Sequence, residues 1–137
     1  MNAKGRILAL DVGKKRIGVA VSDELAMIAR PHSTLPRGKT AAPRILALVS
    51  ELGARRVVVG LPLRLDGSEG EQAADVRRFA AKLAAKAPEV DITFWDERLT
   101  TVEAQERMQS GSRKQKYDID AVAAAVILEG YLKDNDE

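Results

Sequence analysis

The N-terminal part of the chain alternates apolar runs with a short polar turn, a pattern that predicts a β-hairpin. Residues 7–10 form a nearly continuous apolar run, which is typical of a strand buried on both faces. This run ends on Asp11, and the β-branched pattern resumes over residues 17–21. We expect Gly13 to supply the backbone freedom that the intervening turn needs.

The next segments predict an edge strand and an amphipathic helix. Residues 26–35 are less regular, and Pro31 cannot donate a hydrogen bond to a central ladder, so this strand is expected at an edge. Residues 36–43 are expected to form a loop. Residues 44–52 carry apolar side chains at the i, i+3, i+4, i+7 spacing of a helix, and Gly53 is placed to cap it.

A second apolar strand and helix follow. Residues 56–60 predict a short buried strand, and residues 61–67 a loop at its carboxyl end. Ser68 and Glu71 have the spacing of a capping box, which predicts a helix that runs to about Lys86. Strands that alternate with helices imply parallel crossover connections.

The last part of the chain repeats this alternation. Residues 91–95 predict a strand, and Thr100 with Glu103 predicts a capping box and a helix to about residue 109. Residues 118–132 are apolar almost all round, which is typical of a helix packed onto the centre of a sheet.

Composition narrows the class of protein. The 137 residues predict a single domain over 1–137, with 134–137 as a frayed tail. The absence of cysteine excludes disulfides, thiolate metal sites and thiol catalysis. No apolar stretch has the length of a signal peptide or a membrane span, so we expect a cytoplasmic protein without membrane contact. The net charge of +2 permits a polyanionic partner.

Acidic residues stand at the expected strand ends. Asp11 follows the first strand, Asp96 and Glu97 follow the last, and Asp120 lies in the first turn of the last helix. In an open α/β sheet these ends form the ligand crevice, and carboxylates without Cys or His favour Mg²⁺ or Mn²⁺. Asp118 and Asp120 point about 200° apart on a helix, so Asp120 is the better ligand. Taken singly, Asp11 also fits an Asx-turn and Asp120 a favourable helix dipole.

Basic residues occur close to these acids. They are Lys14 and Lys15 in the first turn, Arg98 after the last strand, and Arg113, Lys114 and Lys116 in a loop before the last helix. Each cluster alone is typical of a solvated loop, but basic groups beside carboxylates suit a nucleic-acid backbone. We expect these six residues, with the helix starts at Ser68 and Thr100, to bind phosphates.

Four segments resemble one known family, in its order and approximate spacing. They are LALDVGKKRIGVAVSD, VVVGLPLRLDGSEG, DERLTTVEA and IDAVAAAVILEGYL. The chain resembles the YqgF-type family of Holliday-junction-resolvase-like proteins, within the ribonuclease H-like superfamily. The resemblance implies an α/β fold with a mixed five-stranded sheet, strands 1–3 antiparallel and strands 4 and 5 parallel to strand 1, and helices on both faces. It also implies a metal-dependent nuclease that processes the 5′ end of pre-16S rRNA.

Carried over residue by residue, the acids of this family fall on Asp11, Glu97 and Asp120. In the strand order of the superfamily, Glu97 ends a strand two positions from Asp11, about 9 to 10 Å away. Its side chain must therefore lean inward, and Asp66 or Glu69 on a nearer loop is an alternative ligand.

The resulting hypothesis is hydrolysis of a phosphodiester by water activated at two divalent ions about 3.5 to 4 Å apart. RNA is the favoured substrate. The alternatives are a Holliday-junction DNA resolvase and a non-catalytic RNA-binding or ribosome-assembly module. Actin-like ATPases and sugar kinases share an Asp-x-Gly hairpin, but they need a second domain for which 137 residues leave no room.

Overall fold

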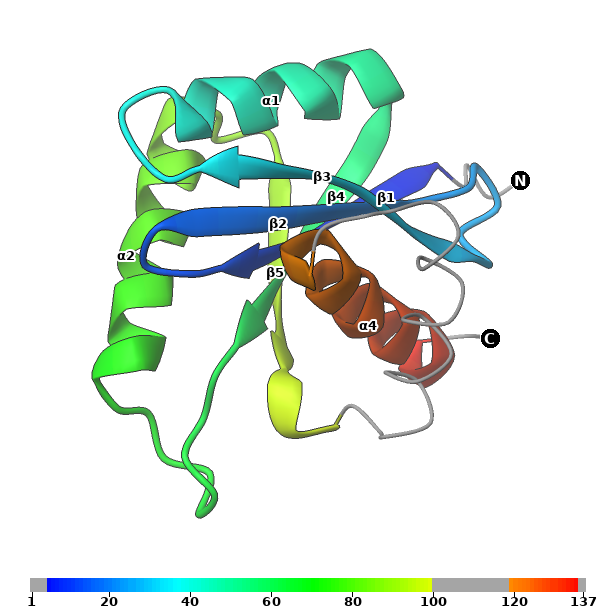
Figure 1. The fold of residues 1–137 in the computed structure, drawn as a ribbon. Coiled ribbons are helices and arrows are strands. Elements are labelled where there is room, and N and C mark those ends of the chain that lie inside the picture. The colour runs from blue at the N-terminus through cyan, green and yellow to red at the C-terminus, as the bar shows by residue number, and fades with distance from the viewer. Residues whose placement is uncertain (1–4, 100–118, 136–137) are drawn as a thin grey trace.

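A computed structural model describes residues 5–99 and 119–135, which form a mixed five-stranded sheet with helices against both faces (Figure 1). In chain order the elements are β1 (Arg6–Val12), β2 (Arg16–Ser22), β3 (Ala29–Pro36), α1 (Ala41–Leu52), β4 (Ala54–Leu61), α2 (Glu71–Lys86), β5 (Asp91–Asp96), the short 3₁₀ helix η1 (Glu97–Leu99) and α4 (Ile119–Asp134).

The sheet has the strand order β3-β2-β1-β4-β5. Strands β1, β2 and β3 pair antiparallel, while β4 pairs parallel to β1 and β5 parallel to β4. Short turns suffice for the antiparallel pairs, whereas α1 and α2 provide the longer crossovers that parallel pairs require. The predicted sheet is confirmed, including the position of β3 at an edge.

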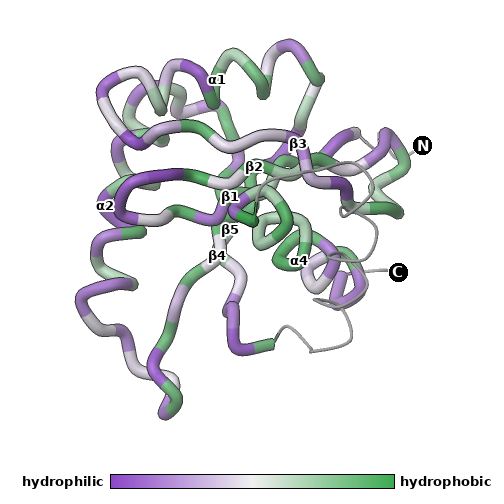
Figure 2. Tube along the Cα trace, in the orientation of Figure 1, coloured by the Kyte–Doolittle hydropathy of each residue, from purple (hydrophilic) through white to green (hydrophobic). Residues whose placement is uncertain are grey.

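Alternating side chains along the strands build one core on each face of the sheet. Leu8 and Leu10 of β1 pack under α1 and α2, whereas Ile7 and Ala9 pack under α4. Helix α4 crosses β1, β2 and β3, and Figure 2 shows that its N-terminal turns are predominantly hydrophobic. The nearly all-round apolar sequence of this helix is thereby explained, as predicted.

The first helix begins earlier than its apolar spacing predicted. Helix α1 starts at Ala41, so the predicted helix start at residue 44 was wrong, and the loop predicted over residues 36–43 is confined to residues 37–40. Pro43 lies in the first turn of α1, where its missing N–H costs no intrahelical hydrogen bond. Gly53 caps the helix as predicted, with a left-handed φ of 66° and its N–H directed to the carbonyls of the last turn.

The predicted capping box at Ser68 was also wrong. Helix α2 begins at Glu71 with Gly70 as N-cap, and no side chain caps it. Ser68 instead remains in the β4–α2 loop, where its Oγ donates to Asp66 Oδ1 at 2.6 Å. The carboxylate two residues before Ser68 therefore competes successfully for the hydroxyl group that the helix would have used.

Gly13 is needed for space rather than for backbone freedom. Within residues 5–99 and 119–135, positive φ among glycines occurs only at Gly53 and Gly67, so the expected role of Gly13 was wrong. A Cβ at Gly13 would lie 2.8 Å from the carbonyl oxygen of Arg16, which accepts a hydrogen bond from the Gly13 N–H. The β1–β2 turn closes tightly because this Cβ is missing.

The predicted helix over 100–109 and residue Asp118 lie outside the described residues. Asp134, expected in a frayed tail, is the last residue of α4, and the Asn135 N–H donates to the Tyr131 carbonyl at 3.0 Å. In the part of the chain that the structure describes, no helix is long and apolar enough to cross a membrane.

Candidate active site

Asp11 lies on the face of the sheet that α4 covers. Ile7 and Ala9 of β1 pack against α4, and side chains two residues apart point to the same face, so Asp11 points there too. Leu8 and Leu10 point to the opposite face, into the core under α1 and α2. A single carboxylate therefore continues an otherwise apolar row of side chains.

A glycine in β2 brings the start of α4 close to Asp11. Gly18 pairs directly with Asp11 across the β1–β2 ladder. A Cβ at Gly18 would lie 1.8 Å from the carbonyl oxygen of Asp120 and 3.0 Å from the backbone nitrogen of Ala121. The backbone of α4 thus rests directly on β2, which places Asp120 in the neighbourhood of Asp11.

A second glycine, in β4, makes room for Glu97. Strand β4 separates β1 from β5, so Glu97 must reach across it to approach Asp11. A Cβ at Gly60 would lie 2.7 Å from Glu97 Oε2, 3.1 Å from Glu97 Cγ and 2.5 Å from Ile127 Cδ1. The inward lean that the strand order demands of Glu97 is therefore present, over a residue without a side chain.

Sequence reasoning did not identify these two glycines as part of the site. The available signal was a glycine within each of two otherwise apolar strands, at Gly18 and Gly60. Glycine inside a strand often marks close approach of another group. Here the two glycines lie on the strands on either side of β1. Gly18 leaves space for the backbone of Asp120, and Gly60 leaves space for the side chain of Glu97.

The three acids are coupled electrostatically. Burial raises the pKa of Asp11, and the nearby charge of Asp120 raises it further. Burial also raises the pKa of Glu97 to about 7, with additional contributions from Asp11 and Asp96. Asp11 thus interacts with both other acids, and a cation would relieve the repulsion among them.

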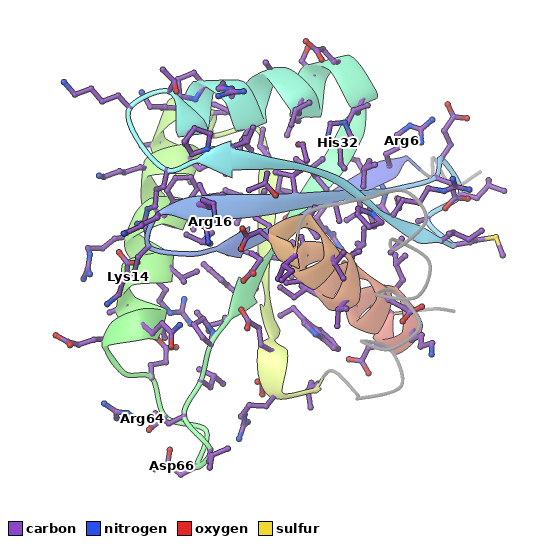
Figure 3. The ribbon with its side chains drawn as sticks, viewed as in Figure 1. Arg6, Lys14, Arg16, His32, Arg64 and Asp66 are labelled. Atoms are coloured by element: carbon purple, nitrogen blue, oxygen red, sulfur yellow. The ribbon has the colours of Figure 1, made fainter. Side chains whose placement is uncertain are left out.

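Arg16 currently supplies a positive charge to Asp120. Asp120 Oδ2 accepts a hydrogen bond from Arg16 Nε at 2.8 Å. Figure 3 shows Arg16 on β2, on the side of the sheet where α4 begins. Arg16 carried no specific role in the sequence-based prediction, although it follows the two lysines of the first turn directly.

The two alternative acids have other partners. Asp66 accepts hydrogen bonds from the backbone N–H and the hydroxyl group of Ser68, which lower its pKa. Glu69 forms two hydrogen bonds of 2.7 Å with Arg77, which lower the pKa of Glu69. Figure 3 places Asp66 at the tip of the β4–α2 loop, away from the start of α4.

Arg98 ties the end of β5 to the β4–α2 loop. Its guanidinium group contacts both carboxylate oxygens of Asp96, the shortest contact being 2.8 Å, and donates to the Leu65 carbonyl at 3.1 Å. These bonds lower the pKa of Asp96. The structure thus gives Arg98 an anchoring contact, in addition to the phosphate contact that the sequence predicts.

The β1–β2 turn presents exposed cations next to α2. Lys14 and Lys15 are exposed on this turn. Arg37, which sequence reasoning missed, donates to the Gly13 carbonyl at 2.9 Å and holds Asp75 of α2 with two bonds of 2.7 and 3.0 Å. The remaining predicted cations, Arg113, Lys114 and Lys116, lie outside the described residues.

The three acids offer the right donor atoms for a divalent cation and lie in the same region of the fold. Their side chains, as they stand, are too far apart to share one ion. Within residues 5–99 and 119–135, no three acidic or histidine groups are gathered closely enough to hold a metal ion. Asp11, Glu97 and Asp120 offer only oxygen donors, as Mg²⁺ and Mn²⁺ prefer. Because Asp120 is bound to Arg16, we expect metal binding to exchange this contact for the ion.

The raised pKa of Glu97 predicts how stability depends on pH. Between its ordinary value of 4.5 and about 7, the folded protein holds a proton that the unfolded chain has lost. The free energy of unfolding of the metal-free protein should therefore fall as pH rises through this window, by on the order of 2 kcal/mol after allowance for partial exposure. Asp11 acts in the same direction.

Urea denaturation in the presence of a chelator, at about pH 5 and about pH 8, measures this effect. Glu97→Gln should show a clearly smaller difference between the two pH values than wild type. A wild-type protein that is equally stable at both values would contradict the burial and repulsion assigned to Glu97.

Known proteins similar to this chain are described as nucleases or resolvases. The RuvX family, described as Holliday junction resolvase, matches residues 5–134. A Chloroflexus aggregans protein named "Putative pre-16S rRNA nuclease" is 47% identical over 131 residues, which cover 92% of this chain and 92% of that protein. A Clavibacter michiganensis protein of the same name is 46% identical over 135 residues, which cover 94% of this chain and 83% of that protein.

Among solved structures, Thermus thermophilus RuvC in complex with a Holliday junction substrate has a TM-score of 0.58 at 12% identity. The match covers 96% of each chain. This likeness confirms the predicted ribonuclease H-like fold class.

Proposed function

Because this chain belongs to the RuvX family, we propose that it is a nuclease that processes the 5′ end of pre-16S rRNA. The observation that carries the proposal is the convergence of Asp11, Glu97 and Asp120 from three separate elements. Two glycines in the sheet admit Glu97 and Asp120 to the neighbourhood of Asp11. The names of the curated relatives indicate pre-16S rRNA as the substrate. In this chain, the three acids would be the place where the reaction occurs.

We infer that Asp11, Glu97 and Asp120 would hold Mg²⁺ or Mn²⁺. The ion would supply activation of the attacking water and stabilisation of the leaving oxygen. Before it can act as a ligand, the Glu97 carboxyl group has to lose its proton, which a pKa of about 7 leaves on part of the molecules in neutral solution. Arg16 would orient the carboxylate of Asp120 in the metal-free protein.

The nucleic acid would be bound through its backbone rather than its bases. Lys14 and Lys15 extend from the β1–β2 turn, close in sequence to Asp11. Arg98 and the basic loop at 113–116 remain predicted phosphate contacts. In the part of the chain that the structure describes, no phenylalanine, tyrosine or tryptophan side chain is in the exposed class, so recognition is expected to depend on shape and charge.

The second candidate function is resolution of four-way DNA junctions. It is favoured by the description of the matching family and by the fold shared with a resolvase bound to such a junction. Both functions use the same hydrolysis and differ in the nucleic acid presented to the acids.

A panel of labelled substrates tests the proposal. Purified protein with Mg²⁺ or Mn²⁺ should cleave a precursor RNA that spans the 5′ end of 16S rRNA, and a chelator should abolish the cleavage. A four-way DNA junction and an unrelated RNA of equal length are the comparisons. Cleavage confined to the junction would move the resolvase ahead, and no cleavage of any substrate with either metal would contradict the nuclease.

Gly60→Ala tests the path by which Glu97 reaches Asp11. The new Cβ would meet Glu97 Oε2 and Ile127 Cδ1, which are ends of flexible side chains and can move aside. We expect the cleavage rate to fall by about 10² because a displaced catalytic group costs about that factor. The melting temperature should change by only a few degrees, as for overpacking of about 1 kcal/mol.

The double variant Gly60→Ala with Ile127→Val provides the control. It removes the apolar contact, so stability should recover while the cleavage rate stays low. Recovery of both would show that Gly60 serves helix packing and that the position of Glu97 is immaterial to the reaction.

A further inference from the structure

A basic groove lies on the face of the sheet opposite the three acids. It runs between the start of α1 and the C-terminal half of α2 and encloses about 340 Å³. We call it the basic groove and define it by the cations Arg37, Lys39, Lys82 and Lys86, with Ala42 and Phe79 as its apolar floor.

The charges of the basic groove have one sign. No acidic side chain lines it. Arg37 is neutralised by Asp75, whereas Lys39, Lys82 and Lys86 take part in no ion pair with any residue that the structure describes. Several like charges around one hollow repel each other unless an anion binds, so the groove is suited to an anionic ligand.

The cations of α2 form a row along the helix rather than a single cluster, and we call this row the track. Arg78, Lys82 and Lys86 follow each other at intervals of four residues, are all exposed and lie on one side of the helix. Each interval advances about 6 Å along the helix axis. A row of positive charges with this regular spacing fits a linear polyanion better than a single phosphate group.

The track continues to the turn that follows Asp11. Arg37 lines the basic groove and also a second hollow, which Lys14 and Arg78 line together with the acids Glu71 and Asp75. Its guanidinium group lies 5.4 Å from the centre of the Phe79 ring. Together with its bonds to the Gly13 carbonyl and Asp75, this contact fixes the turn against α2. Basic side chains therefore extend from the groove, past Glu71 and Asp75, to the β1–β2 turn that follows Asp11.

We propose that the basic groove binds the phosphodiester backbone of a nucleic acid whose scissile bond lies at the three acids. The nucleic-acid strand bends around the ends of β1 and β2 at the turn that joins them. It then continues along α2 on the other face of the sheet. The identity of the ligand rests on the proposed function. Lysine side chains bind phosphates as point charges and Phe79 is buried beneath Arg37, so the contact is independent of base sequence.

The test is a binding experiment without cleavage, in the presence of a chelator. Lys82→Gln with Lys86→Gln is compared with a control that removes two exposed cations elsewhere, Arg30→Gln with Lys133→Gln. The first double variant should bind a long single-stranded RNA about tenfold more weakly at low salt than the control. Its slope of log K against log salt should be smaller by about 1.4, or about 1.8 for a DNA duplex arm.

Nucleic acids of different length show whether the loss of affinity arises at the basic groove. An oligonucleotide of a few nucleotides cannot span the whole row of cations, so the Lys82 and Lys86 double substitution should weaken its binding less than that of long RNA. Long RNA and a four-way DNA junction are run side by side, and the ligand that loses more affinity identifies the nucleic acid that the groove binds.

Affinity and salt slope equal to those of the control variant for every long ligand would overturn the proposal. A poly-glutamate peptide that binds wild type as tightly as RNA and is lost in the double variant would also overturn it, in favour of an acidic protein partner. Failure of the nuclease assay leaves these binding results intact, so the two proposals fail separately.

Discussion

Replacing Asp11 with asparagine is expected to lower the rate of phosphodiester cleavage by at least about 10³-fold, equivalent to about 4 kcal/mol of transition-state stabilisation. Asp11 is the acid that interacts with both Glu97 and Asp120, so its loss removes the central acid of the proposed metal site. The fold should persist. Since a raised pKa marks an unfavourable buried charge, the metal-free variant should melt at the same or a higher temperature than wild type at about pH 8.

Single-turnover cleavage of a precursor RNA and thermal melting are measured on the same preparations. Asp134→Asn, which neutralises an exposed carboxylate at the far end of α4, is the matched control and should behave as wild type. An Asp11→Asn variant that cleaves within tenfold of wild type would contradict the assigned role of Asp11.

Replacing Gly18 with alanine is expected to damage both stability and activity. The added Cβ would lie 1.8 Å from the backbone oxygen of Asp120, and a backbone atom inside a helix cannot swing away as a side chain can. Helix α4 would have to recede by more than about 1 Å. Overpacking of this kind costs about 1 to 3 kcal/mol or more, and a catalytic group misplaced by 1 Å costs about 10² in rate.

A fall of about 10 °C in melting temperature is the expected result, with cleavage reduced about 100-fold at temperatures where the variant stays folded. Gly38→Ala is the control, because a Cβ at Gly38 meets nothing within 4 Å. Equal melting temperatures for Gly18→Ala and Gly38→Ala would show that α4 does not rest on β2 as described.

Most helices and strands could be predicted because hydrophobic periodicity reports which faces of each element are buried, whereas the strand directions in the sheet were predicted from the family resemblance. The nearly all-round apolar run of α4 predicted a helix packed on the centre of the sheet, and the structure shows a helix packed on the sheet but against β2, β3 and β1 rather than at its centre. The residues at which helices begin were harder to predict from the sequence. Ser68 had the spacing of a capping residue, but Asp66 binds its hydroxyl group, and no periodicity reports such local competition.

The sequence showed Asp11 and Glu97 at strand ends and Asp120 in the first turn of the last helix, and the family resemblance selected these three acids. The groups that surround them could not be predicted. A sequence indicates that Gly18 and Gly60 interrupt apolar strands but not which distant group approaches each of them. The pairing of Arg16 with Asp120 joins residues 104 positions apart. Contacts of this range depend on the crossing of α4 over the sheet, which local patterns do not encode.

The central claim is that Asp11, Glu97 and Asp120 form a site for a divalent cation, and thermal melting with added Mg²⁺ or Mn²⁺ tests it most directly. A ligand that binds only the folded state stabilises it by about 2.7 kcal/mol at one hundred times its dissociation constant. The experiment is run without nucleic acid at about pH 8, where Glu97 has lost its proton.

The melting temperature of wild type should rise with metal concentration, and the rise should be smaller at about pH 6 and largely absent in Asp11→Asn. An unchanged wild-type melting temperature up to millimolar Mg²⁺ and Mn²⁺ would contradict metal binding by the three acids in the absence of nucleic acid.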